Sequence, residues 1–121
     1  MSEIDHETDV LVGDWLTLPE VAERLGISVG QVKQLLRQRK LIGVQREPGS
    51  QMHVPAAFLR GDHVLKGLHG TLTLLADSGY NEVESLRWLF TADDSLPGTP
   101  VQALAENRST EVNRRAEVLG F

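Results

Sequence analysis

Glutamine, lysine and arginine side chains are concentrated between residues 28 and 40, and no carboxylate interrupts them. In the major groove of DNA, glutamine can form two hydrogen bonds with adenine, and arginine can form two with guanine. Lysine ammonium groups suit the phosphate backbone instead. A merely solvated surface helix normally mixes both signs of charge, so the missing carboxylates favour a surface that binds a polyanion.

The spacing of apolar residues predicts a DNA-reading helix over about residues 28–40. At 100° per residue, the valines and leucines of this segment fall in one sector, and its glutamines and Arg37 fall in the opposite one. Arg37 lies near the centre of the outer face and is expected to read a base, whereas the lysines lie towards its edges and suit phosphates. The residues of this segment expected to contact DNA are Ser28, Gln31, Lys33, Gln34, Arg37, Gln38, Arg39 and Lys40.

The charge distribution along the chain supports the same surface. The net charge of -5 conceals three blocks of alternating sign. Residues 1–23 hold seven carboxylates and no lysine or arginine, residues 24–66 hold eight basic side chains against two acidic ones, and residues 67–121 are again acidic. A basic middle between acidic flanks is typical of a local polyanion-binding surface in an otherwise acidic protein.

Two capping patterns predict the elements that position this surface. Thr17 and Glu20 have the spacing of a capping box, which predicts a short helix that ends at Gly26. Ser28 and Gln31 repeat the pattern at the start of the candidate reading helix. Two short helices joined by a glycine turn have the order of a helix-turn-helix.

A β-hairpin is predicted directly after the second helix. Residues 41–46 form a β-prone run, residues 47–50 are turn-forming, and residues 51–54 alternate polar with apolar. A hairpin in this place is the wing of a winged helix-turn-helix, and Arg46 and His53 on it are further expected DNA contacts.

The remaining chain divides into an acidic tail and a helical region. Residues 1–13 show no helical period and are expected to be a disordered tail. Residues 14–62 are expected to form the DNA-binding domain, and residues 63–121 a helical region for dimerisation or partner binding. The expected fold is therefore mainly α, a winged helix-turn-helix with a short hairpin wing followed by a helical unit. Within the last region helices are expected at 64–77, 81–90 and 101–119, with a linker at 91–100 and a break near 107–110.

Several kinds of chemistry are not expected in this chain. It has no cysteine, so disulfides, thiolate zinc sites and cysteine nucleophiles are excluded. Its four histidines form no metal-binding motif, and its carboxylates and glycines form no catalytic pair or phosphate loop. We therefore expect no metal, no cofactor and no enzyme activity. No signal peptide or membrane-spanning run is evident, so a cytoplasmic location without membrane association is expected.

Residues 15–45 (WLTLPEVAERLGISVGQVKQLLRQRKLIGVQ), closed by HVPAAFL, resemble the winged helix-turn-helix of MerR-like and excisionase-like DNA-binding proteins. With LHGTLTLLADSGYNEVESLRWLFT and GTPVQALAENRSTEVNRRAE, the chain is similar to a family of small actinobacterial DNA-binding regulators. The long coiled-coil helix and cysteine ligands of larger MerR-like regulators are missing, so metal or drug sensing is not implied.

This resemblance implies a transcriptional regulator bound to double-stranded DNA in the nucleoid. It is also compatible with control by a Ser/Thr protein kinase. Thr8 lies between Glu7 and Asp9 in the segment expected to be flexible, which makes it the expected phosphorylation site.

An alternative function involves the helical region. The order of residues from Trp88 to Val112 also resembles the toxin-binding domain of Xre-type antitoxins, with a W-L-F…G-T-P-V pattern. In that case the essential contact of residues 64–121 would be another protein. A homodimer is also open, because small winged helices usually read long sites as dimers.

Overall fold

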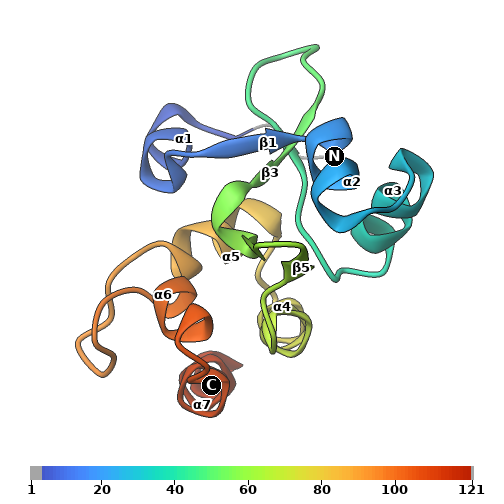
Figure 1. The fold of residues 1–121 in the computed structure, drawn as a ribbon. Helices are drawn as coiled ribbons and strands as arrows, with labels where there is room; N and C mark the ends of the chain where they lie inside the picture. The colour runs from blue at the N-terminus through green and yellow to red at the C-terminus, as the bar shows by residue number, and fades with distance from the viewer. Residues whose placement is uncertain (1–3, 121) are drawn as a thin grey trace.

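Short helices dominate the structure, and the strands of the described residues all lie between residues 15 and 64 (Figure 1). This computed structural model describes residues 4–120. The elements of the first half are α1 (His6–Val12), β1 (Trp15–Thr17), α2 (Leu18–Leu25), α3 (Val29–Arg37), β2 (Val44–Gln45), β3 (Met52–Pro55), the 3-10 turn η1 (Ala56–Phe58), β4 (Leu59–Arg60) and β5 (His63–Val64). Those of the second half are α4 (Leu68–Asp77), α5 (Glu82–Leu89), α6 (Pro100–Ala105), α7 (Ser109–Glu117) and η2 (Val118–Gly120). The predicted mainly α, winged helix-turn-helix fold with a helical C-terminal unit is confirmed.

The wing belongs to a three-stranded antiparallel sheet with the order β1-β3-β2. Val44 pairs with His53 on one side of β3, and Leu16 pairs with Val54 on the other. The hairpin of β2 and β3 was predicted, whereas β1 was not. This strand has only three residues and runs directly into the cap of α2, so it leaves no alternating pattern in the sequence.

Both predicted capping boxes are present. In α2 the Glu20 amide donates to the Thr17 hydroxyl, and the Thr17 amide donates to Glu20 Oε1 at 2.8 Å. This hydrogen bond from the Thr17 amide is the main cause that lowers the pKa of Glu20. The helix ends at Gly26, whose φ of 69° is a left-handed conformation that glycine adopts without steric cost.

The N-terminal segment is ordered, which corrects one prediction. Residues 1–13 were expected to be a disordered tail, but α1 forms here and Asp5 caps it, while residues 1–3 lie outside the described part. The Thr8 side chain is fully buried, and its hydroxyl donates to Asp5 Oδ1 at 2.5 Å. The Ile4 amide donates to the Gln45 carbonyl, so this segment also bonds to the outer edge of β2. The partners of α1 are distant in sequence, and helical periodicity therefore gave no signal for it.

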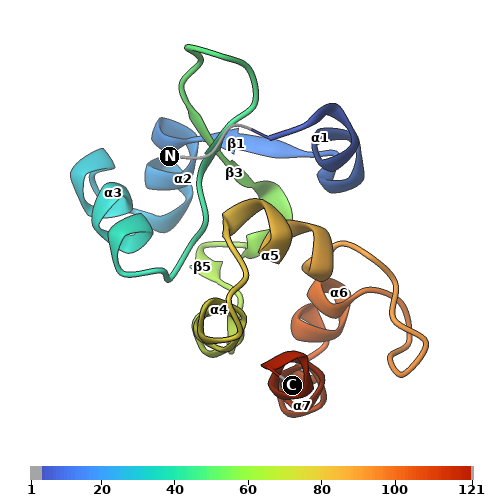
Figure 2. The ribbon, with the colours of Figure 1, turned by 180° about the vertical axis from the view of Figure 1, so that it is seen from behind.

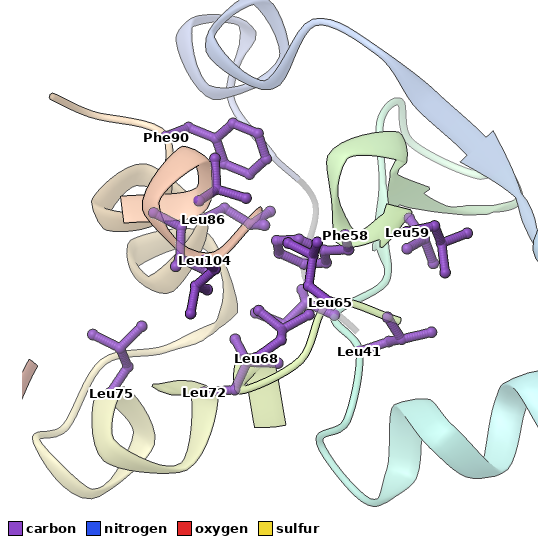
Figure 3. Packing of buried hydrophobic residues seen from close by; sticks show 14 of the residues in the cluster. Leu41, Phe58, Leu59, Leu65, Leu68, Leu72, Leu75, Leu86, Phe90 and Leu104 are labelled. Atoms are coloured by element: carbon purple, nitrogen blue, oxygen red, sulfur yellow. The ribbon is translucent and has the colours of Figure 1, made fainter. Parts of the chain in front are cut away.

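One apolar core runs from the winged helix-turn-helix into the helical region (Figure 3). Phe58 from η1 is fully buried, and its ring lies 5.9 Å from that of Phe90 at the end of α5. Leu65 and Leu68 extend this cluster towards α4, as the close-up shows. The β4–β5 hairpin crosses the boundary predicted at residues 62 and 63, so the two halves are joined by both a hairpin and a core.

The helices α4 and α7 approach each other closely at Gly67. A Cβ atom on Gly67 would lie 2.6 Å from Ser109 Cβ, much nearer than real Cβ contacts. One turn further along, the Thr71 hydroxyl donates to Asn113 Oδ1 at 2.6 Å. Small residues at the start of α4 thus allow the two backbones to come together and seat α7 on the core.

Gly67→Ala is expected to destabilise the protein more than Gly79→Ala. The two glycines have φ values of 87° and 89°, so each alanine should cost about 1–2 kcal/mol of backbone strain. Only Gly67 also meets a neighbouring side chain, which should add about 1–3 kcal/mol, because no atom lies within 4 Å of a Cβ on Gly79. Urea unfolding of the two variants measures this difference in the free energy of unfolding. Equal losses of stability would show that α4 and α7 can move apart at Gly67 without cost.

Candidate nucleic-acid interface

The outer face of α3 is polar and exposed, and its inner face is fixed in the core. Val32 is fully buried, and Leu35 and Leu36 pack partly against the core. The exposed side chains and glycine of the helix and its caps are Ser28, Gly30, Gln31, Lys33, Gln34, Arg37 and Gln38. Rotation of α3 would expose Val32, so burial of Val32 fixes the orientation of the helix. In this orientation the predicted contact residues of the helix lie on one surface.

Two local hydrogen-bond pairs order the polar side chains of this face. At the N-terminus, the Ser28 amide donates to Gln31 Oε1 at 2.8 Å, and the Gln31 amide donates to the Ser28 hydroxyl at 3.1 Å. Further along, Arg37 Nε donates to Gln34 Oε1 at 3.2 Å. Gln34 therefore steadies the Arg37 guanidinium through Nε, and the two terminal nitrogens can point outwards, which is the geometry a bidentate contact to guanine needs.

The helix ends earlier than the predicted boundary near residue 40. It ends at Arg37, and the chain turns at Arg39, which has a left-handed φ of 57°. The Arg39 carbonyl lies 3.2 Å from Nδ1 of His69 on α4. Arg39 and the exposed Lys40 therefore lie beyond the C-terminus of the helix and not along its edge.

Arg46 of the wing is held by the N-terminal helix. Its guanidinium forms an ion pair with Asp9 at 3.1 Å and lies over the Trp15 ring, 5.6 Å from the ring centroid. The Trp15 indole N–H donates to the same Asp9 carboxylate at 2.9 Å. The contact of Arg46 with DNA stays a prediction, and it requires this pair to open.

His53 lies half-buried in the middle strand of the sheet. Its Nδ1 is 2.9 Å from the Gln51 carbonyl, a contact within the wing itself. Among the predicted wing residues, neither Arg46 nor His53 is as exposed as the polar side chains of α3. The wing is therefore a weaker candidate surface than the helix.

A groove separates α3 from the wing, and the sequence did not reveal it. Its volume is about 460 Å³, and it opens to solvent. Lys33 brings a positive charge to its lining. The other lining residues are Leu18, Pro19, Val29, Gln45, Ser50, Gln51 and Met52. The groove depends on the packing of α2, α3 and the hairpin, so no local pattern predicts it.

Metal and membrane binding have no visible basis in residues 4–120. Within this part of the chain, no three histidine or carboxylate side chains are grouped so that they could hold a metal ion. None of the helices there is both long and apolar enough to cross a bilayer.

Comparison with known proteins gives matches along nearly the whole chain. Residues 3–59 match a family described as the winged helix-turn-helix domain of DNA-binding protein Rv2175c, and residues 65–120 match the C-terminal domain of unknown function of the same protein. The Mycobacterium tuberculosis protein named DNA-binding protein Rv2175c is 41% identical over an alignment that covers 93% of this chain and 86% of that protein. The NMR structure of Rv2175c superposes with a TM-score of 0.82 at 34% identity, covering 100% of this chain and 89% of that one.

Asp9→Ala is expected to lower the free energy of unfolding by about 1–3 kcal/mol, because Arg46 loses its carboxylate partner and the Trp15 indole N–H keeps only its longer contact, 3.4 Å, to the Asp9 backbone carbonyl. Amide protons of α1 should also exchange faster. Asp14→Ala is the matched control, since this substitution removes a nearby exposed carboxylate that is not part of the cluster. If both variants unfold at the same urea concentration, the cluster does not hold α1 in place.

Proposed function

The chain belongs to the Rv2175c family of winged helix-turn-helix proteins, and we propose that it binds double-stranded DNA with the outer face of α3 in the major groove. The observation that carries this proposal is the orientation of α3. Burial of Val32 turns a row of glutamines and Arg37 towards solvent, with no carboxylate among them. Such a face fits the edges of bases and repels no phosphate.

The side chains of this surface have different roles. Arg37 is the base-reading residue, because Gln34 steadies its guanidinium at the centre of the face. Lys33, at the rim of the groove beside the wing, and Lys40, beyond the end of the helix, contact phosphates. Gln31, Gln38, Arg39 and the cap residue Ser28 complete the contact surface.

Binding of this kind suits a transcriptional regulator that acts in the cytoplasm at the nucleoid. The family match supports a DNA-binding protein with a winged helix-turn-helix domain and does not extend to the MerR-like or excisionase-like proteins. The C-terminal region meets the end of α3 through the contact between His69 and the Arg39 carbonyl. This contact lies beyond the C-terminal end of α3 and leaves the glutamines and Arg37 of the outer face exposed.

Arg37→Ala and Lys40→Ala are expected to separate base reading from phosphate binding. Loss of a bidentate guanine contact should cost about 1–3 kcal/mol on a selected DNA site and relax the preference at one base pair. Lys40→Ala should weaken binding to all DNA sequences about equally. It should also reduce the slope of the logarithm of the binding constant against the logarithm of the salt concentration by about one unit. Fluorescence anisotropy with selected and random DNA at fixed salt, repeated over a salt series, measures both effects.

Neither substitution should alter the fold, because both side chains are exposed. If Arg37→Ala loses the same amount of affinity for the selected and the random DNA, Arg37 contacts a phosphate and not a base. Unchanged affinity of both variants would show that another surface binds DNA.

Control by a Ser/Thr kinase at Thr8 requires α1 to open. The premise that Thr8 is accessible is wrong in this structure, since its side chain is fully buried and bonded to Asp5. A phosphate there would add about -1.5 to -2 charges beside Asp5 and Asp9, so it should keep α1 detached and let the acidic segment compete for the basic surface.

Thr8→Glu, as a charge mimic, should therefore raise hydrogen exchange in α1 and weaken DNA binding. The neutral Thr8→Ser variant is the control, because it keeps a hydroxyl that can donate to Asp5 as Thr8 does. Retained protection of α1 in Thr8→Glu, together with unchanged affinity, would exclude this regulation.

A further inference from the structure

The groove between α3 and the wing has the size of a small-molecule site. Its volume is about 460 Å³, and pockets that hold small ligands typically measure about 300–1,000 Å³. In both Figure 1 and Figure 2, α2 lies between α3 and the hairpin, and these three elements supply the lining. Of the lining residues in the described chain, only Lys33 belongs to the surface proposed to bind DNA.

Apolar side chains make up half of this lining. Leu18 and Pro19 begin α2, Val29 begins α3, and Met52 begins β3. Met52 lies against Gly43, since a Cβ atom on that glycine would be 2.9 Å from the methionine methyl carbon. Val29 and Met52 are half-buried, so they still expose apolar surface along the groove. A ligand with an apolar body would cover this surface, which is favourable.

The charge of the lining is positive and has no counter-charge. Lys33 is exposed, and it is the only charged side chain among the lining residues of the described chain. Within residues 4–120 its ammonium group takes part in no ion pair. Arg46 of the wing, by contrast, is already paired with Asp9. An anionic group is therefore the complement of this lining, and a cationic ligand would meet a like charge.

We propose that the groove binds a small amphipathic carboxylate, with its apolar body against Val29 and Met52 and its carboxylate at Lys33. Charge complementarity selects the anion. The apolar side chains favour a ligand with a hydrocarbon body over an inorganic anion. The side-chain amides of Gln45 and Gln51, which also line the groove, supply further donors for the carboxylate oxygens.

Occupation of the groove regulates DNA binding, a step that rests on the proposed function. Lys33 is a proposed phosphate contact, so a bound carboxylate neutralises a charge that DNA would otherwise use. The carboxylate and DNA then compete for one ammonium group, and each weakens binding of the other by the same factor. The groove is thus an effector site within the winged domain itself.

The site is tested in the full chain without DNA, with sodium octanoate as the probe and neutral octanamide as its uncharged counterpart. NMR chemical-shift mapping should show the largest changes at Val29, Lys33 and Met52, with a dissociation constant of about 1 mM or tighter. Another hollow of the described chain, at Tyr80 and Trp88, is an internal control and should not respond. The proposal is overturned if octanoate causes no saturable shifts, or if the largest shifts lie at that hollow.

Three variants separate the charge of the ligand from its apolar body. Lys33→Gln should weaken octanoate binding about two- to fivefold and leave octanamide binding unchanged, because only the carboxylate meets the ammonium group. Lys66→Gln removes an exposed lysine outside the groove and should leave both affinities unchanged. Val29→Ser should weaken both probes about equally, because it removes apolar lining. Wild-type affinity of Lys33→Gln for octanoate would refute the ion pair, and wild-type affinity of Val29→Ser for both probes would refute the apolar contact.

Fluorescence anisotropy with labelled DNA then tests the regulation. Octanoate at a saturating concentration should weaken DNA binding by wild type about fivefold or more, and octanamide should weaken it less. Sodium chloride keeps the total sodium concentration constant, because DNA affinity depends on salt. Unchanged DNA affinity with octanoate bound in the groove would refute the competition. A wild-type protein that binds octanoate but neither selected nor random DNA would refute the proposed function and leave the carboxylate site in place.

Discussion

Burial of Phe58 determines how the two halves of this molecule are held together. The residue lies in a three-residue turn between the wing sheet and the β4–β5 hairpin, is fully buried, and packs against Phe90 of α5. The carbonyl of Phe58 also accepts a hydrogen bond from the Leu65 amide, across the hairpin. Because side chains from both halves surround the same ring, the angle between α3 and α5 depends on core packing and not on a linker.

The proposed reading surface is ordered by local hydrogen bonds where it faces solvent and is anchored where it meets the rest of the chain. Val32 sets the rotation of α3, two hydrogen-bonded pairs order its outer side chains, and the contact between His69 and Arg39 fixes its C-terminal end. Side chains on a rigid helix lose less conformational entropy on binding than side chains on a loop. The wing differs, because Arg46 already has a carboxylate partner in Asp9.

Local signals predicted most of this architecture, and long-range contacts account for the rest. Capping boxes at Thr17 and Ser28 gave the starts of α2 and α3, since both depend on residues three positions apart. The early end of α3 was missed because Arg39 adopts a left-handed conformation that is rare outside glycine. The order of α1 was also missed, because Asp9 binds Arg46 and Trp15 across separate elements. The groove between α3 and the wing likewise arises from three elements meeting.

The hydrogen bond from the Ile4 amide to the Gln45 carbonyl affects how molecules of this protein meet at high density. β2 is an edge strand of the wing sheet, and exposed edge strands are templates for pairing with a strand of another chain. The N-terminal segment occupies this acceptor from within the same chain. A neighbouring molecule therefore meets a covered acceptor at this position, which disfavours edge-to-edge pairing of the wing.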